Sequence, residues 1–247
     1  MITQFDHLTL YTKDLAAHRT ILESLGYKLR FQATPNNPQI KKPLVEHFSP
    51  THKLALFDLP GSLSIELIEE SQPSGYSSCI VPIFENVPEK HVEHVGTAMR
   101  FGSLDVHEAK LKGLEAPVFV TKGAGSVKFT SYALMTNDIA ANAAVWKALG
   151  WKQVTDAQFT FASPIHGFAS DLFLANAVIQ TPVKLDCEGF NYVALVSTSA
   201  KKERERLMKA GLEVTELEEH RVNGKVLDLF FITGKNVQPT EVLGLHS

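Results

Sequence analysis

The chain has 247 residues, which at about 150 residues per domain corresponds to one large domain or two small ones. Lys and Arg number 24 and Asp and Glu number 27, so the formal charge of −3 argues against binding of nucleic acid through a basic surface. Cys79 and Cys187 form no Cys-x-x-Cys pair, which argues against a disulfide scaffold or a zinc ribbon. With no signal-peptide pattern or long apolar run, we expect a soluble, cytoplasmic protein with no membrane partner.

The N-terminal segment predicts a strand followed by a capped helix. Residues 5–11 alternate in polarity, as a strand with two different faces does, and His7 and Thr9 share one face. Asp14 can cap the helix that follows, and Gly26 stands where a left-handed C-terminal cap belongs. Three β-favouring segments come next, at residues 27–31, 53–59 and 62–69. The first module is therefore predicted to be βαβββ.

The same pattern returns 124 positions later. Aligning Phe5 with Phe129 without a gap also places Asp14 on Asp138, so the strand, the helix cap and the helix recur together. The spacing is about half the chain length, which indicates an internal duplication of a half-molecule.

A second, weaker repeat places residues 94–115 on residues 192–213, 98 positions later. Each half then holds two related units, so we expect an N-terminal domain at 1–125 and a C-terminal domain at 126–247. Four modules are expected, beginning near Phe5, Glu93, Phe129 and Phe190. The second is partial, because too few residues separate Gly113 from Phe129 for three more strands.

These motifs resemble the vicinal oxygen chelate superfamily. The resemblance rests on His in FDHLTL, on the Thr-x-Asp-[Leu/Ile]-Ala-Ala helix that ends in Leu-Gly-aromatic, and on Ile-Glu-Leu-Ile in the fourth strand. That superfamily includes glyoxalase I, methylmalonyl-CoA epimerase, extradiol dioxygenases and the fosfomycin- and bleomycin-resistance proteins. The resemblance implies an α+β fold in which βαβββ modules pair into cupped, barrel-like mixed sheets with helices outside.

The resemblance also implies a metal site. Members usually bind a divalent metal through one residue on the first strand and one on the fourth strand of each module. Carried over to this sequence, those positions are His7 and Glu66 in the first module and His94 in the second. Two imidazoles and a carboxylate suit Fe(II), Mn(II), Zn(II) or Ni(II). The alternatives are that His7 is a hydrogen-bonded polar residue at a barrel end and that Glu66 is exposed.

Two further residues are candidates for substrate binding, and no catalytic residue is assigned. Arg100 has the same strand parity as His94 and could bind a substrate carboxylate, with a surface ion pair as the alternative. Thr9 lies on the same strand face as His7.

The second half lacks a comparable ligand set. Its first-strand positions hold Ser131 and Tyr192, and its fourth-strand positions hold Gln180 and Glu241. One carboxylate without imidazoles is a poor site for a transition metal. We therefore expect the second half to be structural, or to bind an organic molecule without metal.

Three functions stay open at this point. The first is a metal-dependent lyase, isomerase or dioxygenase that acts on a small oxygen-chelating substrate, and the sequence favours it. The second is a metal-free binding protein of the bleomycin-resistance type, which the incomplete ligand set and the aromatic residues at the module starts would suit. The third is a protein whose cup has closed. A truncated second module would expose a sheet edge, so a homodimer is expected.

Overall fold

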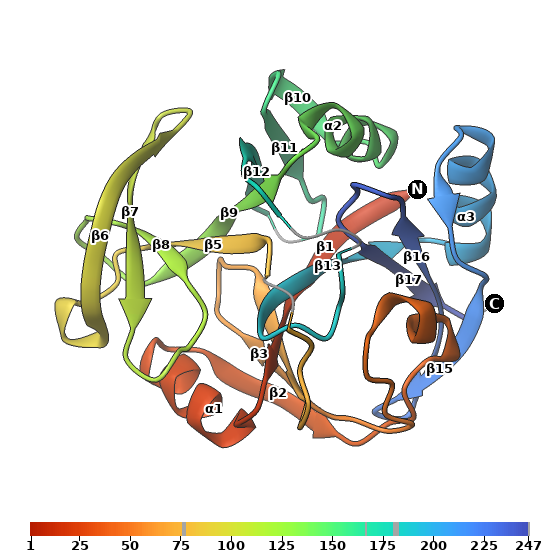
Figure 1. Cartoon of the computed structure of the whole chain (residues 1–247), viewed down its shortest axis with the longest axis horizontal. Coiled ribbons are helices and arrows are strands. Elements are labelled where there is room, and N and C mark those ends of the chain that lie inside the picture. The colour runs from red at the N-terminus through yellow and green to blue at the C-terminus, as the bar shows by residue number, and fades with distance from the viewer. Residues whose placement is uncertain (76–77, 166, 180–182, 247) are drawn as a thin grey trace.

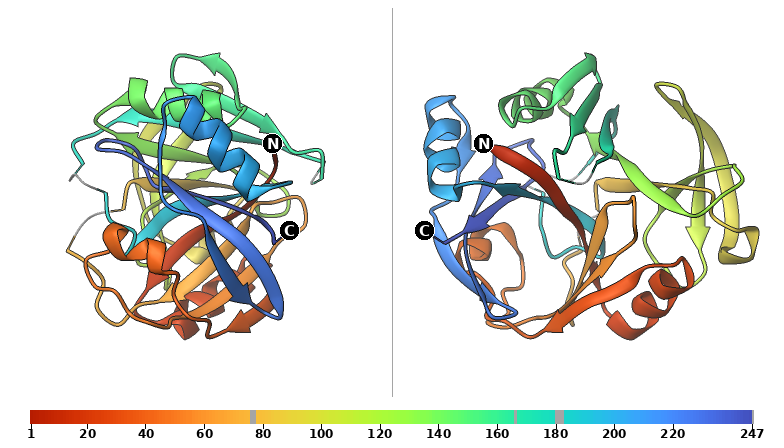
Figure 2. Two further views of the ribbon diagram at one scale, coloured as in Figure 1. Left: turned by 90° about the vertical axis from the view of Figure 1, so that its right-hand side faces the viewer. Right: turned by 180° about the vertical axis from the view of Figure 1, so that it is seen from behind.

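The computed structural model describes residues 1–75, 78–165, 167–179 and 183–246. Strands make up most of its regular structure, and helices α1, α2 and α3 lie outside them (Figures 1 and 2). This is the α+β fold that the family resemblance implied, with an open, cupped mixed sheet. Among the described residues, no helix has the length and hydrophobicity that crossing a membrane requires.

The first module has the predicted βαβββ order. It consists of β1 (Ile2–Thr12), α1 (Leu15–Ser24), β2 (Lys28–Ala33), β3 (Lys53–Asp58) and β4 (Ser64–Glu69). The Asp14 side chain accepts a hydrogen bond from Ala17 N and so caps α1, as its position before the apolar stripe predicts. Gly26 follows with φ +98°, the left-handed conformation that ends the helix.

The second module begins earlier than the sequence indicated. Its first strand is β5 (Ile80–Glu85), in the apolar stretch that the repeat comparison left as an insertion. A short 3₁₀ turn, η2 (Glu89–His91), follows where the other modules have a helix. The module continues with β6 (Val92–Phe101), β7 (Leu104–Leu111) and β8 (Val118–Thr121). It therefore has four strands and no helix, and His94 lies on its second strand, not its first.

The third module follows the βαβββ order, and the fourth follows it with one strand divided in two. The third consists of β9 (Lys128–Thr136), α2 (Ile139–Ala148), β10 (Lys152–Thr155), β11 (Gln158–Ala162) and β12 (Ala169–Asn176). The fourth consists of β13 (Gly189–Ser197), α3 (Ala200–Lys209), β14 (Glu213–Val214), β15 (Glu218–Val222), β16 (Lys225–Thr233) and β17 (Thr240–Leu245). The strand after its helix is divided into β14 and β15, which both pair with β16.

The modules pair across the two halves of the chain. Strand β1 runs antiparallel to β13, which joins modules one and four, and β5 runs antiparallel to β9, which joins modules two and three. Each pair forms one cup: the first cup is modules one and four, and the second cup is modules two and three (Figure 1). The segments 1–125 and 126–247 each hold two modules, but the modules of one segment do not form a cup together. This places His7 and His94 in different cups.

Candidate functional site

Two glutamates occupy matching places in the first cup. Strand β4 runs parallel to β1 with Glu66 opposite Thr9, and β17 runs parallel to β13 with Glu241 opposite Ala194. Because the two modules are joined by the antiparallel β1–β13 pair, equivalent positions from both converge on the same concave surface. Fourth-strand glutamates from opposite ends of the sequence are therefore brought together.

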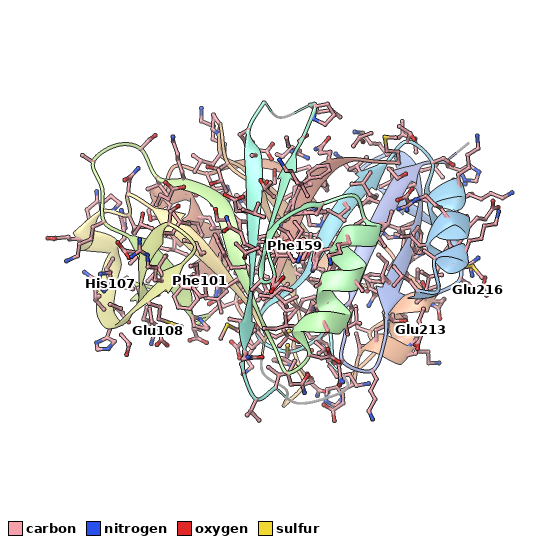
Figure 3. The ribbon with its side chains drawn as sticks, turned by 90° about the horizontal axis from the view of Figure 1, so that it is seen from above. Phe101, His107, Glu108, Phe159, Glu213 and Glu216 are labelled. Atoms are coloured by element: carbon pink, nitrogen blue, oxygen red, sulfur yellow. The ribbon has the colours of Figure 1, made fainter. Side chains whose placement is uncertain are left out.

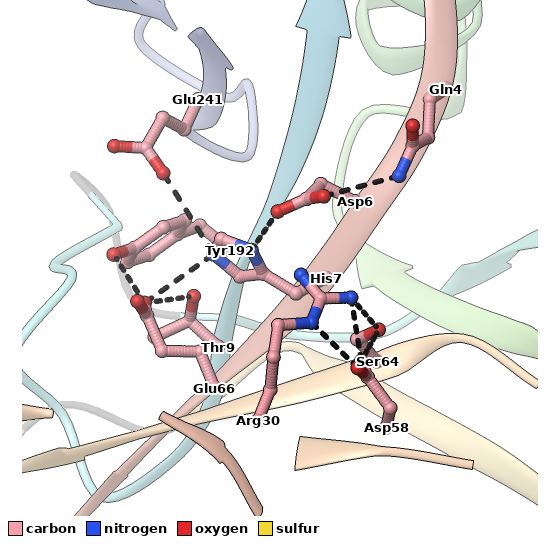
Figure 4. Close-up of polar contacts among 10 residues, drawn as sticks. All are labelled: Gln4, Asp6, His7, Thr9, Arg30, Asp58, Ser64, Glu66, Tyr192 and Glu241. Carbon is pink, nitrogen blue, oxygen red and sulfur yellow. Dashed lines mark hydrogen bonds and ion pairs between the residues drawn. The ribbon is translucent and has the colours of Figure 1, made fainter. Parts of the chain in front are cut away.

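The first-strand residues at the matching positions are His7 and Tyr192, and all four side chains meet (Figure 4). His7 Nε2 lies 3.4 Å from Glu66 Oε2 and 4.0 Å from Glu241 Oε2. Tyr192 OH donates to Glu66 Oε2 at 3.5 Å, and Thr9 Oγ1 donates to the same oxygen at 3.1 Å. All of these residues are buried, so their polar atoms interact with one another and not with bulk water.

Asp6 fixes the orientation of the His7 ring. Its carboxylate accepts a hydrogen bond from His7 Nδ1 at 2.8 Å, which directs Nε2 toward the two glutamates. Nε2 is buried and has no hydrogen-bond partner within the described residues, because its contact with Glu66 is an ion pair without hydrogen-bond geometry. A carboxylate behind a histidine whose other nitrogen is unused is the usual arrangement of a metal-binding imidazole.

The electrostatics tie His7 and Glu66 together. Burial alone would lower the pKa of His7, but the charges of Glu66 and Asp6 outweigh it and raise this pKa to about 10. Burial alone would raise the pKa of Glu66, but His7 and Lys41 lower it to about 2. Without a metal, His7 is thus an imidazolium beside a carboxylate, and a metal cation would take the place of its Nε2 proton.

The donor atoms of His7, Glu66 and Glu241 are of the types that bind divalent metals. Ligand atoms bound at about 2.0–2.2 Å to one ion can be up to about 4.4 Å apart, and both distances from His7 Nε2 lie below that limit. One imidazole and two carboxylates suit Mn(II), Fe(II) or Zn(II). In the described part of the chain, no three histidine, cysteine, aspartate or glutamate side chains already surround a shared metal position.

A cavity of about 420 Å³ opens from these residues between the two modules of the first cup. This size is typical of sites for small organic molecules, which range over about 300–1,000 Å³. One wall carries Phe31, Leu54 and Leu56, from β2 and β3, and the facing wall carries leucines from β16 and β17. Polar groups line the rest of the cavity: Asp6, His7, Arg30, Lys41, His52, Glu66, Tyr192, His220, Asn223, Lys225 and Glu241.

The segment between β2 and β3, residues 34–52, forms a strap across this cup. Its 3₁₀ helix η1 (Gln39–Leu44) lies beside β15 in Figure 1, drawn in orange-red. Backbone N–H groups of Gln39 and Ile40 donate to the two carboxylate oxygens of Glu218, both at 2.9 Å. Further along, Glu46 N donates to Asp186 Oδ2 at 2.9 Å. Module four and the segment before it therefore hold the strap in place.

The structure does not bring His94 or Arg100 to this site. His94 is exposed and borders a separate surface hollow beside β7, so it does not join His7 and Glu66. The Arg100 side chain is 69% exposed, near Asp105 at 3.6 Å. Both residues lie on β6, and because β6 belongs to the second cup, neither side chain reaches the first. Thr9 is buried against Glu66 and does not line the cavity, and Gln180 lies outside the described residues.

The second cup is filled with phenylalanines at the matching positions. Phe173 lies opposite Ala133 and Phe119 lies opposite Ile83, the registers that carry Glu66 and Glu241 in the first cup. Both rings pack on Phe101, with ring centroids 5.5 and 5.3 Å apart. Figure 3 shows Phe101 in the half of the molecule opposite Glu213 and Glu216 of module four.

The internal repeats did not predict that Glu241, Tyr192 and Lys41 belong to this site. Glu241 lies in the half without imidazoles, and the prediction assumed that modules pair within each half. The signal that could have found Glu241 is the match between the two fourth strands, Ile-Glu-Leu in the first module and Thr-Glu-Val in the last. No repeat signal marks Lys41, because the strap has no counterpart in module three, where β10 and β11 are joined by two residues.

Comparison with known proteins agrees with this architecture. No protein-family model matches the sequence, and no curated protein is significantly similar to it. Glyoxalase I from Zea mays superposes with a TM-score of 0.60 over 98% of this chain and 92% of its own, at 14% identity. A Bacillus subtilis subsp. subtilis str. 168 protein, provisionally described as a dioxygenase, gives a TM-score of 0.66 over 100% of this chain and 86% of its own, at 12% identity. The chain therefore has the fold of the vicinal oxygen chelate superfamily.

Proposed function

We propose that the first cup is the active site of a metal-dependent enzyme of the glyoxalase or dioxygenase type that acts on a small oxygen-chelating organic molecule. His7, Glu66 and Glu241 would hold the metal, with Glu241 in the role that the sequence assigned to His94. The observation that carries the proposal is the buried His7 Nε2 without a hydrogen-bond partner, facing two carboxylates at 3.4 and 4.0 Å.

The surrounding residues have separate roles in such a site. When bound, the metal supplies a Lewis acid that polarises a chelated substrate oxygen. Asp6 holds the imidazole with Nε2 directed into the cup, and Thr9 and Tyr192 hold the carboxylate of Glu66 by donating to one of its oxygens. The strap covers the cup and limits the access of water to the substrate.

A metal-free binding protein is the second candidate. The observation that favours it is the buried cation of Lys41. Burial raises the pKa of Glu66, whereas the positive charges of His7 and, to a smaller extent, Lys41 lower it. In that case the ammonium, and not a metal, would offset the negative charge of the carboxylates.

A cytoplasmic location and a homodimer stay predictions.

Metal titration tests the proposal. Protein made without a histidine tag and stripped with a chelator is titrated with Mn(II), Fe(II) and Zn(II) by calorimetry. Wild type should take up one ion, and Glu241→Gln should weaken binding by more than about 100-fold, beyond the range for residues that only support ligands. Glu69→Gln is the matched control, because Glu69 follows Glu66 on β4 but pairs with Lys53 at the surface.

Two results would reject the proposal: no metal uptake by wild type, or equal affinity in wild type and Glu241→Gln. Oxygen uptake with Fe(II) and catechols, and isomerisation of thiohemiacetals, then separate the dioxygenase type from the glyoxalase type. Binding of an organic ligand that survives complete removal of metal, without turnover of that ligand, would favour the metal-free binding protein.

A further inference from the structure

Lys41 places a buried positive charge in the first cup. Its side chain extends from the strap, and the residue is 3% exposed. Nζ donates to Tyr192 OH at 2.8 Å and lies 4.9 Å from the Tyr192 ring centroid and 5.7 Å from that of Phe231. Within the described residues no carboxylate lies at ion-pair distance from this ammonium. A buried ammonium is costly unless an opposite charge offsets it.

The nearby glutamates do not supply that charge once a metal is present. Glu66 and Glu241 line the same cavity, but the proposed function assigns both to a divalent cation. The Lys41 end of the cavity then carries a positive charge without an anion beside it. This step rests on the proposed function.

Two histidines add hydrogen-bond donors at the same end. His52 at the end of the strap and His220 on β15 both line the cavity. Burial, followed by the charge of Lys41, lowers the pKa of His52 to about 3 and also lowers that of His220. Both rings are therefore neutral at physiological pH, and each has one N–H group to donate.

The rest of the cavity selects an apolar molecule with one anionic end. Leucines and Phe31 form its two walls, and the exposed Lys225 also lines it and would attract an anion from solution, whereas Arg30 is already paired with Asp58. A volume of about 420 Å³ accommodates a small organic molecule. At the Lys41 end, a buried cation lies among neutral N–H donors.

We propose that the substrate of this cup is an organic acid with an apolar body, and that its carboxylate binds Lys41 with His52 and His220 as further donors. The hydrocarbon part lies between the two leucine-bearing walls. Lys41 Nζ and Glu66 Oε2 both contact Tyr192 OH, so the oxygen that the metal would chelate belongs to the same end of the molecule as the carboxylate. Lys41 is a substrate-binding residue in this assignment and is not a metal ligand.

The test uses phenylacetate as the probe and phenylacetamide as its uncharged match. Both are titrated into the full-length protein by calorimetry, with and without Mn(II). Phenylacetate should bind, phenylacetamide should bind at least about tenfold more weakly, and Lys41→Met should remove that difference. Lys42→Met is the control, because Lys42 is exposed on the same turn of helix, and it should bind both probes as wild type does.

The outcomes separate this inference from the proposed function. If phenylacetate binds in a Lys41-dependent manner but Mn(II) does not bind, the metal is rejected and the acid-binding site stands. If Mn(II) binds but Lys41→Met binds phenylacetate as tightly as wild type, the inference is overturned; the same holds if phenylacetate shows no binding at millimolar concentration. Lys41→Arg keeps the charge and should retain most of the affinity, which shows that a loss in Lys41→Met is not a folding defect.

Discussion

The two cups join their modules in the same way, with the fourth-strand positions in matching registers, but they differ in what fills them. In the first cup Glu66 and Glu241 stand at the fourth-strand positions, and in the second cup Phe173 and Phe119 stand there. The phenylalanines pack on Phe101, whereas the glutamates border an open cavity. The fold alone therefore does not make a site, and two residues per cup decide which cup can have one.

The comparison also separates stability from function. The second cup buries three aromatic rings against one another, which is favourable packing. The first cup buries carboxylates, imidazoles and an ammonium, which is unfavourable unless each charge has a partner. We infer that the second cup supports the molecule and that the first cup gives up some stability for chemistry.

The largest expected effect is on stability, from emptying the second cup. Phe101→Ala removes the ring that packs on both Phe119 and Phe173, and should lower the free energy of unfolding by about 3–5 kcal/mol. Phe31→Ala in the first cup should cost less, because Phe31 is only partly buried and already borders a cavity. Urea unfolding measures both. Equal losses, or loss of metal binding in Phe101→Ala, would contradict the separation of roles.

Making the first cup resemble the second should abolish metal binding. Glu66→Phe introduces the residue that stands at this position in the second cup and removes one carboxylate, so Mn(II) affinity should fall by more than about 100-fold. Glu66→Gln, which keeps the shape, should show the same loss without added bulk. Electron paramagnetic resonance of free Mn(II) measures both. Normal affinity in Glu66→Gln would mean that this carboxylate is not a ligand.

Removing the support of His7 should have a smaller effect on the same measurement. Asp6→Asn leaves the imidazole without the carboxylate that accepts from Nδ1, and Mn(II) affinity should fall by about 10- to 100-fold. The matched variant is Asp58→Asn, because Asp58 pairs with Arg30 near the cavity and has no contact with His7. A fall of equal size in both variants would show a general loss of negative charge.

The smallest expected effect is a pH dependence that arises from His52 in the first cup. The pKa of His52 in the folded state is about 3, compared with 6.5 for an ordinary histidine. Burial and the charge of Lys41 lower this pKa, and His220 lowers it further, whereas the charge of Glu66 raises it. Because the unfolded state binds the proton first, His52 costs the protein stability as the pH falls below 6.5. Between pH 8 and pH 5.5 this contribution is about 1.4 kcal/mol.

His52→Gln should therefore lose less stability than wild type over that range. Urea unfolding of both proteins at the two pH values isolates the contribution of His52, since the other titrating groups are common to both. If the two proteins lose stability in parallel, His52 is not held neutral in the folded state.

Local patterns predicted much of the fold. The alternating face of β1, the Asp14 cap and Gly26 identified the first module, and the repeat identified the third, since these signals come from residues near one another in sequence. The start of module two was misplaced, because the apolar strand β5 lacks a following helix and so resembles an insertion.

Half of the candidate site could be predicted and half could not. His7 and Glu66 belong to one module, and their positions follow from its strand order. Glu241 depends on which module pairs with the first, a long-range choice that no local pattern encodes. Lys41 depends on the strap, whose path is set by contacts with Glu218 and Asp186 in the second half of the chain.

The most direct test of the account is a crystal structure of the Mn(II)-soaked protein with anomalous diffraction data. We expect one strong anomalous peak in the first cup, at about 2.0–2.2 Å from His7 Nε2 and bound by Glu66 and Glu241, and none in the second cup. A first cup without a peak at saturating Mn(II), or a peak bound by other residues, would contradict it.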